Sequence, residues 1–345
     1  MATLNEIARK ADVSVGTVDR VLHNRGRVSK ETRKKVLKIV KEIGYRPNIL
    51  ARSLSLKKTY TFGVLVPIPD QDGRYWELPI SGMQRALDEL KLYNLEASMF
   101  TYDKYSASSF HEACQNVDSA VNKLDGLVIA PVLSKASEQF ISHLPENMPY
   151  VFIDSYIPDS RCIAYIGQDS FQSGILAAKL MQMMVHKGKV VVMHILPIDY
   201  HIDDRVRGFQ LCIQKNNNLS ISMIDVDREI DTDIFANVSE KILHNRNDVS
   251  GIFVPSACAH QVAETLVRLN RSDDIVLIGY DLVEENRKYL KTNAIDFLIS
   301  QRPALQGYQS IYSLYRHVIL NEPVDEKVVV PMDILTQDNV DYYQG

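Results

Sequence analysis

In the first part of the chain, apolar residues recur every three or four positions, a spacing that places them on one face of a helix. Two such faces are Leu4, Ile7, Ala8 and Ala11, followed by Val18, Val21 and Leu22. Thr3 and Glu6 are spaced as a capping box at the start of the first helix, and Ser14 can cap the second helix through Thr17. Because about three residues join the two helices, this pattern predicts a helix-turn-helix.

A third helix is expected to begin at Ser29, with Glu31 in its first turn to suit the helix dipole, and to end at Gly44. Its apolar side consists of Val36, Ile39, Val40 and Ile43, and its outer side carries Lys34, Lys35, Lys38 and Lys41. The three helices can bury their apolar faces against one another, which predicts a small all-α head.

From Thr61 the pattern changes to short apolar runs separated by longer amphipathic stretches. The runs that we interpret as buried strands are 61–67, 95–102, 126–130 and 150–153, then 164–167, 189–195, 219–226, 251–254 and 275–280. The stretches that we interpret as helices are 76–92, 110–124, 171–186, 203–215, 234–244 and 258–268. This alternation predicts an α/β domain built on parallel sheets.

The remainder of the chain is too long for one core, since about 285 residues exceed the usual size of a domain. Two lobes are therefore expected, with a break near residues 154–163. Residues 294–345 hold a strand, a long helix from Pro303 and a last strand near 327–331, and we expect them to cross back and complete both lobes. The predicted lobes are about 61–160 plus 294–320, and about 161–293 plus 321–345.

Charge divides the chain at the same place as the hydrophobic pattern. Residues 1–58 contain 15 Lys plus Arg against 5 Asp plus Glu, a net charge of +10, whereas the rest contains 24 against 38, a net charge of −14. A basic head on an acidic body indicates a small module that binds a polyanion, joined to a domain with another task. A basic head that binds only other proteins is the plainer alternative.

After the head, Pro47 ends the helical region and Asn48 can cap one more helical turn, which is too short to be stable alone. At this point the sequence resembles the lactose/purine repressor (LacI) family. The matching motifs are Ala2-Thr3-Leu4-Asn5-Glu6-Ile7-Ala8, Val13-Ser14, Thr17-Val18, Arg20-Val21-Leu22, Arg46-Pro47-Asn48 and Ala51-Arg52-Ser53-Leu54. The resemblance implies a helix-turn-helix DNA-binding domain at 1–46, a hinge helix and linker at 47–60, and an effector-binding and dimerisation domain at 61–345.

The resemblance also implies which residues contact DNA. The second helix would lie in the major groove with Val15, Gly16 and Arg20 nearest the bases, and Leu54 would wedge between base pairs from the minor groove. The full implied set is Ser14, Val15, Gly16, Thr17, Arg20, Arg25, Arg27 and Ser29 in the head and Asn48, Ala51, Arg52 and Leu54 in the hinge. Asp19 departs from the family pattern, which usually has Ser there, so the operator preference is not carried over.

The acidic body resembles sugar-binding periplasmic proteins of the ribose type, a two-lobed (type I) fold that holds its ligand between the lobes at the carboxyl ends of the strands. The implied effector-binding residues are Asp70, Tyr75, Trp76, Ala130, Asp154, Arg205, Ser256, Asp281 and Gln301. Asp72 and Arg74 lie beside Asp70, just before the aromatic pair, and are expected to add polar contacts. Ala130 and Ser256 stand where ribose-type proteins commonly have asparagine, which favours a larger or differently substituted ligand. The plainer alternatives are a core role for the Tyr75-Trp76 pair, a surface ion pair for Arg205 and a helix-capping role for Asp281.

An enzyme of the same fold is the main alternative, but the sequence has no phosphate-binding loop, no G-x-S-x-G and no H-E-x-x-H. His194, His201, Asp203 and Asp204 lack a matching cluster, so neither a metal nor a cofactor is expected. The four cysteines form no C-x-x-C pair and are typical of a reducing cytoplasm.

A periplasmic sugar receptor is the second alternative, but residues 1–30 contain no apolar core of signal-peptide length and no segment is long enough to span a membrane. The sequence therefore predicts a cytoplasmic transcription regulator, in the repressor mode commoner in the family. It is expected to bind palindromic double-stranded operator DNA as a homodimer and to respond to a small sugar-like effector. The identity of the effector and the sign of its influence on DNA binding are left open.

Overall fold

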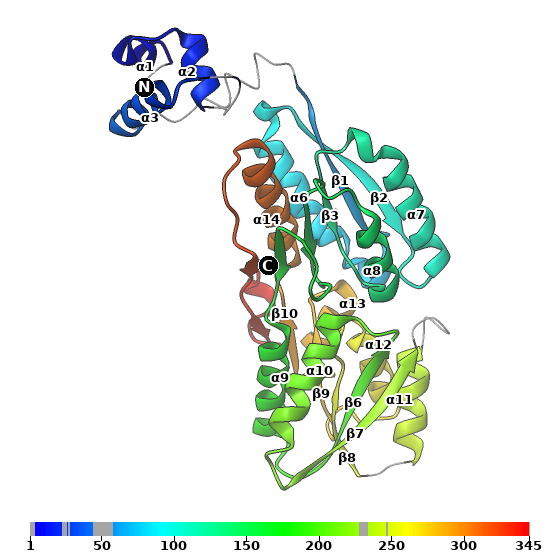
Figure 1. Cartoon of the computed structure of the whole chain (residues 1–345). Helices are drawn as coiled ribbons and strands as arrows, with labels where there is room; N and C mark the ends of the chain where they lie inside the picture. The colour runs from blue at the N-terminus through cyan, green and yellow to red at the C-terminus, as the bar shows by residue number, and fades with distance from the viewer. Residues whose placement is uncertain are drawn as a thin grey trace. The chain divides into compact units, whose positions relative to one another are not determined.

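The computed structural model describes residues 4–22, 26, 28–43, 58–227, 234–245 and 248–344. The chain divides into two compact units, residues 1–57 and 58–345. Figure 1 shows the head in blue and the larger unit in colours from cyan to red. No helix of the described residues is both long and apolar enough to cross a membrane.

The head contains three helices, as the sequence predicts: α1 (Leu4–Ala11), α2 (Val15–Leu22) and α3 (Lys30–Glu42). The predicted cap of α2 is confirmed, since the Ser14 hydroxyl accepts from the Thr17 amide at 3.1 Å. Ser29, where the third helix was expected to begin, caps α3 by accepting from the Thr32 amide at 3.1 Å. The side chains that form the core are Ile7, Ala8, Ala11, Val18, Val21 and Val36. The predicted capping box at Thr3, the stop at Gly44 and the hinge at 47–57 lie outside the described residues.

The first sheet of the larger unit has the strand order β11-β5-β4-β3-β1-β2, with every pairing parallel. Its strands are β1 (Tyr60–Pro67), β2 (Leu95–Tyr102), β3 (Gly126–Ile129), β4 (Tyr150–Ile153), β5 (Ala164–Gly167) and β11 (Lys327–Val329). Its helices are α6 (Glu77–Glu89), α7 (Ala107–Ala120), α8 (Ser134–His143) and α14 (Pro303–Leu314), with a short turn α5 (Gln71–Arg74) after β1. Short 3-10 turns follow α6 at Lys91–Tyr93 and α7 at Val121–Lys123. Separate apolar clusters lie on the two faces of this sheet, which is how helices cover a parallel sheet.

The second sheet has the order β12-β10-β9-β8-β6-β7, and only the pairing of β10 with β12 is antiparallel among these described strands. Its strands are β6 (Gly188–Leu196), β7 (Leu219–Asp227), β8 (Val249–Phe253), β9 (Val276–Tyr280), β10 (Phe297–Ser300) and β12 (Asp333–Leu335). Its helices are α9 (Ser170–Met184), α10 (Tyr200–Ile213), α11 (Ile234–Asn245), α12 (Ala259–Arg268) and α13 (Glu284–Lys291). A π-helical turn at Tyr315–Ile319 extends α14, and a 3-10 turn at Val340–Tyr342 follows β12.

The predicted division of the chain between the lobes is partly wrong. β5 was expected in the second lobe, but it pairs with β4 in the first sheet, so the loop after β4 does not leave that sheet. β10 was expected in the first lobe and pairs with β9 in the second, whereas β11 was expected in the second and pairs with β5 in the first. The physical reason is that a short apolar run shows it is buried without showing beside which strand it is buried.

The chain therefore passes between the sheets at residues 168–169, 301–302 and 330–332. Two of these links, at 301–302 and 330–332, lie in the last part of the chain, as expected. The strand at 333–335, which completes the second sheet, was not predicted from the sequence. Figure 1 shows α14, in orange-brown, beside α6 in the first lobe, with the carboxyl terminus near the junction of the two lobes.

Candidate functional site

A cavity lies between the two lobes, at the carboxyl ends of the strands of both sheets. Seven of the nine predicted effector-binding residues line it: Tyr75, Trp76, Asp154, Arg205, Ser256, Asp281 and Gln301. Its empty space is about 350 Å³. Several of the polar side chains that line it bond to one another.

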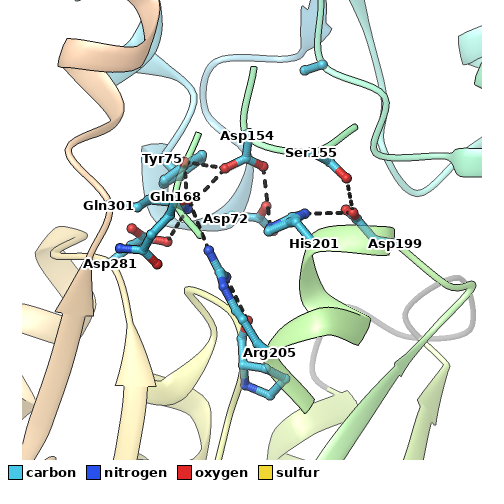
Figure 2. A network of polar contacts seen from close by, with 12 residues as sticks. Asp72, Tyr75, Asp154, Ser155, Gln168, Asp199, His201, Arg205, Asp281 and Gln301 are labelled. Atoms are coloured by element: carbon cyan, nitrogen blue, oxygen red, sulfur yellow. Dashed lines mark hydrogen bonds and ion pairs between the residues drawn. The ribbon is translucent and has the colours of Figure 1, made fainter. Parts of the chain in front are cut away.

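Gln301 lies at the centre of this polar network, in the link 301–302 between β10 and α14 (Figure 2). Its amide nitrogen lies 3.0 Å from the Tyr75 hydroxyl, 3.0 Å from Asp154 Oδ1 and 3.1 Å from Asp281 Oδ2. Its amide oxygen accepts from Arg205 Nη2 at 3.0 Å. One side chain therefore joins groups from both lobes at the point where the chain crosses between them.

Asp154 and Asp281 occupy equivalent places, each directly after a strand. Both have a left-handed backbone, with φ of 66° for Asp154 and 61° for Asp281. Such values are uncommon for residues other than glycine and are often found at functional sites, where the surrounding structure must hold them. The Tyr75 hydroxyl donates to Asp154 Oδ1 at 2.6 Å, and the backbone amide of Asp154 donates to the side chain of Gln306 at 2.9 Å.

Asp281 does not cap the following helix, contrary to the plainer alternative. The residue before α13 is Val283, whose side chain makes no capping bond, and Asn286 instead donates to the backbone carbonyl of Asp281 at 2.9 Å. Burial raises the pKa of the Asp281 carboxyl to about 7, while Arg205 opposes this shift and Asp154 adds to it. Within the described residues, Asp281 Oδ1 has no hydrogen-bond partner.

Tyr75 is held as a hydrogen-bond donor by the same surroundings. Burial, followed by the charges of Asp154 and Asp281, raises the pKa of its phenol well above the usual value of 10.0. The neighbouring Trp76 packs edge-on against the Tyr75 ring, with 5.1 Å between the ring centres. Trp76 is 1% exposed, and its indole Nε1 has no hydrogen-bond partner among the described residues.

Arg205 is a buried cation rather than the partner in a surface ion pair. Its Nη1 donates to the Pro255 carbonyl at 2.9 Å, and its guanidinium lies over the Tyr280 ring at 3.9 Å from the centre. It is 1% exposed, and its Nε lacks a partner within the described residues. The alternative ion pair with Asp203 or Asp204 is wrong, because Asp204 pairs with Arg207 and Asp203 lies 3.8 Å from His194.

Two glycines explain how Arg205 reaches the cavity. A side chain at Gly174 of α9 would collide with the Arg205 carbonyl, and one at Gly208 of α10 would collide with the Phe171 carbonyl. The two helices therefore approach closely at these positions, which fixes α10 and the arginine that it carries. The glycine at position 208, in the segment Arg205-Val206-Arg207-Gly208-Phe209, therefore has a packing reason.

Two predicted effector-binding residues lie elsewhere. Asp70 is exposed just before α5 and does not line the cavity, and Ala130 is buried in the core of the first lobe, where its carbonyl accepts from the Tyr102 hydroxyl at 2.5 Å. The side chain of Ala130 therefore does not line this cavity. β1 ends at Pro67, as predicted, and β3 ends one residue earlier than predicted, but the direction of a side chain beyond a strand end depends on backbone angles that the sequence does not show.

The cavity also includes Asp72, which was expected to add polar contacts, and six residues that were not predicted as ligand contacts: Lys104, Val132, Asp199, His201, Ile202 and Ala257. His201 was considered only as a metal ligand. Its Nδ1 lies 2.7 Å from Asp199 Oδ1 and its Nε2 lies 3.8 Å from Asp154 Oδ2. The described residues contain no group of three or more His, Cys, Asp or Glu side chains that could hold a metal ion. The signal that could have identified these additional cavity residues is their place shortly after β1, β2, β3, β6 and β8.

In the head, α2 presents the predicted reading surface. Ser14, Val15, Gly16 and Arg20 are exposed, Val15 by 39%, while Val18 and Val21 on the opposite side are buried in the core. Ser29 is exposed at the start of α3, and Thr17 is partly buried beside Ser14, with 2.9 Å between the two hydroxyl oxygens. The predicted lysines of α3 are all exposed: Lys34, Lys35, Lys38 and Lys41. Arg25, Arg27, Asn48, Ala51, Arg52 and Leu54 lie outside the described residues.

Comparison with known families finds the same two parts, the head and the larger unit. Residues 3–48 match the family of bacterial regulatory proteins of the lacI type, and residues 62–322 match the periplasmic binding protein domain. The chain is 25% identical to catabolite control protein A of Priestia megaterium over 289 residues, which are 81% of this chain and 82% of that protein. It is also 25% identical to the ribose operon repressor of Halalkalibacterium halodurans over 286 residues, 81% of this chain and 80% of that protein.

Among solved structures, the chain resembles a Bacteroides fragilis protein assigned to the LacI transcriptional regulators. The two share 30% identity and a TM-score of 0.76, and the match covers 83% of this chain and 100% of that one. These relatives are transcription regulators rather than enzymes. With a lacI-type head joined to a two-lobed periplasmic-binding-protein domain, this chain belongs to the LacI family of transcription regulators.

Proposed function

We propose that the protein binds palindromic operator DNA in the cytoplasm as a homodimer and represses transcription there. A small carbohydrate-like effector, held between the two lobes of the larger unit, changes its affinity for that DNA. The observation that carries the proposal is the convergence of seven residues, predicted from separate parts of the sequence, on one cavity between the lobes.

The surface of α2 supports the DNA-binding role. Val15, Gly16 and Arg20 are exposed and free of the head's core, so they are available to base edges in a major groove. Exposed lysines on α3 and the net charge of +10 over residues 1–58 supply the sequence-independent attraction to phosphates. Asp19 accepts hydrogen bonds and repels phosphate, so a cytosine amine is its natural DNA partner.

A dimer is favoured by the DNA and by the sheets. One helix-turn-helix makes few base contacts, and a two-fold dimer on a palindromic site doubles them. β2 and β7 each form one of the two edges of their sheets, and each exposes an apolar side chain, Met99 by 45% and Met223 by 38%. Exposed edge strands are commonly covered by another chain. A second copy of this chain that packs against β2 and β7 would cover one edge of the sheet in each lobe.

The unpartnered atoms of the cavity support the effector site. Trp76 Nε1 and Arg205 Nε can donate, and Asp281 Oδ1 can accept, yet none of these atoms has a partner within the described residues. Buried polar atoms without partners are costly, and a ligand that bonds to them recovers that cost. Sugar hydroxyls both donate and accept, so adjacent hydroxyls of one sugar can satisfy both kinds of atom. The similarity to a ribose operon repressor points to the same class of compound.

Coupling to DNA requires that the effector bind one arrangement of the lobes better than another. Several hydrogen bonds join the lobes: the Ser155 hydroxyl to Asp199, the Tyr156 hydroxyl to Asp204 at 2.6 Å, and the Tyr200 hydroxyl to Glu138 at 2.8 Å. A ligand that adds to these bonds or replaces them changes the free energy of the arrangement in which the two lobes are in contact. The first lobes of a dimer would then move relative to each other and change the spacing of the two hinge segments.

The test begins with a thermal-shift screen of sugars, since a ligand that binds only the folded chain raises its melting temperature. Trp76 is the single tryptophan of the sequence, so a compound bound beside it should change the fluorescence of the protein and saturate at one ligand per chain. A gel-shift assay with operator DNA then measures whether the same compound changes DNA affinity. A confirmed effector that leaves Trp76 fluorescence unchanged, and that binds Arg205→Ala with wild-type affinity, would place the site elsewhere.

A further inference from the structure

Acidic side chains outnumber basic ones around the cavity. The acidic residues that line it are Asp72, Asp154, Asp199 and Asp281, and the basic ones are Lys104, Arg205 and His201. All seven are buried or nearly so, so their charges are poorly screened by water. The net charge of this cavity therefore affects any ligand that enters it.

Two of these charges, those of Lys104 and Asp72, neutralise each other within the first lobe. Lys104 forms a buried ion pair with Asp72, whose other carboxylate oxygen accepts from the Tyr105 hydroxyl at 2.6 Å. This pair belongs to two loops of the first lobe and is complete without a ligand. The charge that a ligand meets is therefore set by the other residues.

The other residues leave an excess of negative charge. The guanidinium of Arg205 donates to the Pro255 carbonyl and to Gln301, and no carboxylate is its hydrogen-bond partner among the bonds described. Asp199 and Asp154 lie on either side of His201, at 2.7 and 3.8 Å, and Asp281 shares only the amide of Gln301. Asp154, Asp199 and Asp281 thus face one guanidinium and one imidazole. Burial raises the pKa of Asp281 to about 7, yet even when Asp281 is protonated, the other two carboxylates outnumber the guanidinium while the imidazole is neutral.

We propose that this excess determines the chemical class of the effector: a polyhydroxylated compound that carries no phosphate or carboxylate group. This inference rests on the proposed function of the cavity. The carboxylates alone would not define a site, but buried Asp281 Oδ1 and Trp76 Nε1 lack partners within the described residues and belong to side chains that line the same cavity. Asp281 Oδ1 accepts a hydroxyl proton, and Trp76 Nε1 donates to a hydroxyl oxygen.

An anionic ligand is disfavoured for two physical reasons. It must lose its own hydration on entry, and the cavity offers one guanidinium whose Nη1 and Nη2 are already bonded to neutral acceptors, which leaves Nε without a partner in the described residues. It also brings a negative charge within a few ångströms of carboxylates at low effective dielectric, where each such contact is strongly repulsive. A neutral hydroxyl has neither cost, and an ammonium group is attracted, so amino sugars stay within the proposed class.

The inference is tested with matched sets of sugars. Each set contains a hexose, its 2-amino-2-deoxy counterpart, its uronic acid and its 6-phosphate, and the affinity of each for the full chain is measured by calorimetry and by Trp76 fluorescence. We expect a hit among the neutral or amino members, with the acid and the phosphate of the same hexose weaker by about 100-fold or more. An acid or phosphate that binds as tightly as its neutral counterpart, at one per chain, would overturn the inference and leave the proposed function intact.

Two variants show whether carboxylates cause the discrimination. Asp281→Asn and Asp199→Asn each remove one carboxylate and keep an acceptor oxygen, and both are measured at about pH 8, where Asp281, with a pKa of about 7, is ionised. The measured quantity is the ratio of the affinities for the neutral sugar and its acid. Each variant that melts cooperatively should reduce this ratio about tenfold. An unchanged ratio in both would refute the electrostatic cause. If no sugar of any charge class binds to a folded wild-type chain, the proposed function itself fails, and this inference fails with it.

Discussion

The DNA-binding head and the cavity between the lobes hold their predicted binding residues in opposite ways. In the head, Val15 and Arg20 are exposed while the other side of the same helix forms the core. In the cavity, Arg205, Asp281 and Gln301 are almost completely buried and bonded to one another or to backbone. Binding and stability are thus separable in the head, whereas in the cavity each residue contributes to both. The predictions below test this difference.

The largest effect is expected for Arg205→Ala. Loss of hydrogen bonds from a buried cation should lower effector affinity by about 1.5–3 kcal/mol, or roughly ten- to more than a hundredfold. The free energy of unfolding should also fall, because the Pro255 carbonyl and Gln301 lose their donor. Calorimetry and urea unfolding measure the two effects.

Arg207→Ala is the matched control, since Arg207 lies on the same helix and makes an exposed ion pair with Asp204. Such pairs contribute about 0–1 kcal/mol, so this variant should bind effector like the wild type. Equal losses in both variants would mean that Arg205 acts only through the general stability of α10.

In the head, Arg20→Ala should cost about 1–3 kcal/mol of specific DNA affinity and change the preferred base at one operator position. The free energy of unfolding should stay within about 0.5 kcal/mol of the wild type, because Arg20 is an exposed residue outside the core. A binding selection on randomised operators reads the base preference.

Lys38→Ala is the control in the head, since this exposed lysine lies on α3. It should weaken binding to all sequences alike, or leave it unchanged, and any loss should reduce the slope of log affinity against log salt by about one. A clear loss of stability in Arg20→Ala would contradict the separation of binding from folding in the head.

A smaller effect concerns pH. The pKa of Asp281 is about 7 in the folded chain against 3.8 ordinarily, so the folded chain holds a proton there that the unfolded chain has already lost. The contribution of Asp281 to the free energy of unfolding therefore falls as pH rises from about 4 to about 7, by at most about 1.4 kcal/mol per pH unit. The charged and titratable groups that act on it are Arg205, Asp154, His201 and Tyr75, with Gln301 as its hydrogen-bond donor.

Asp281→Asn has no such proton to lose. Urea unfolding at about pH 5 and about pH 7 should therefore show a smaller decline with pH in the variant than in the wild type. Identical declines in the two proteins would mean that Asp281 keeps an ordinary pKa despite its burial.

The smallest effect is expected at the edge of the cavity. Asp70→Ala should leave effector affinity within about twofold, since Asp70 is exposed and outside the cavity. Asp72→Ala, two residues away, leaves buried Lys104 without its carboxylate partner and should weaken binding severalfold more. If the two variants behave alike, the boundary of the site at α5 is wrong.

The sequence predicted the elements better than their arrangement. The bounds of β2, β4 and β5 were predicted to the residue, and each of these strands is followed at once by a polar residue: Asp103, Asp154 and Gln168. The sheet to which β5 belongs was not predicted, since pairing joins segments that are distant in sequence. Seven cavity residues were predicted from the resemblance to sugar-binding proteins, whereas Asp199 just before α10 and His201 in its first turn reach the cavity only through the assembly of the lobes.

The late return of the chain to both lobes has a consequence for its synthesis. α14 and β11 complete the first lobe, and β10 and β12 complete the second, so both require residues between 297 and 335. The head needs none of them, since its core is made by residues 4–43. Because domains fold as they emerge from the ribosome, the head can adopt its structure long before either lobe is whole. A nascent chain would thus gain its DNA-reading surface first and its ability to respond to a ligand last.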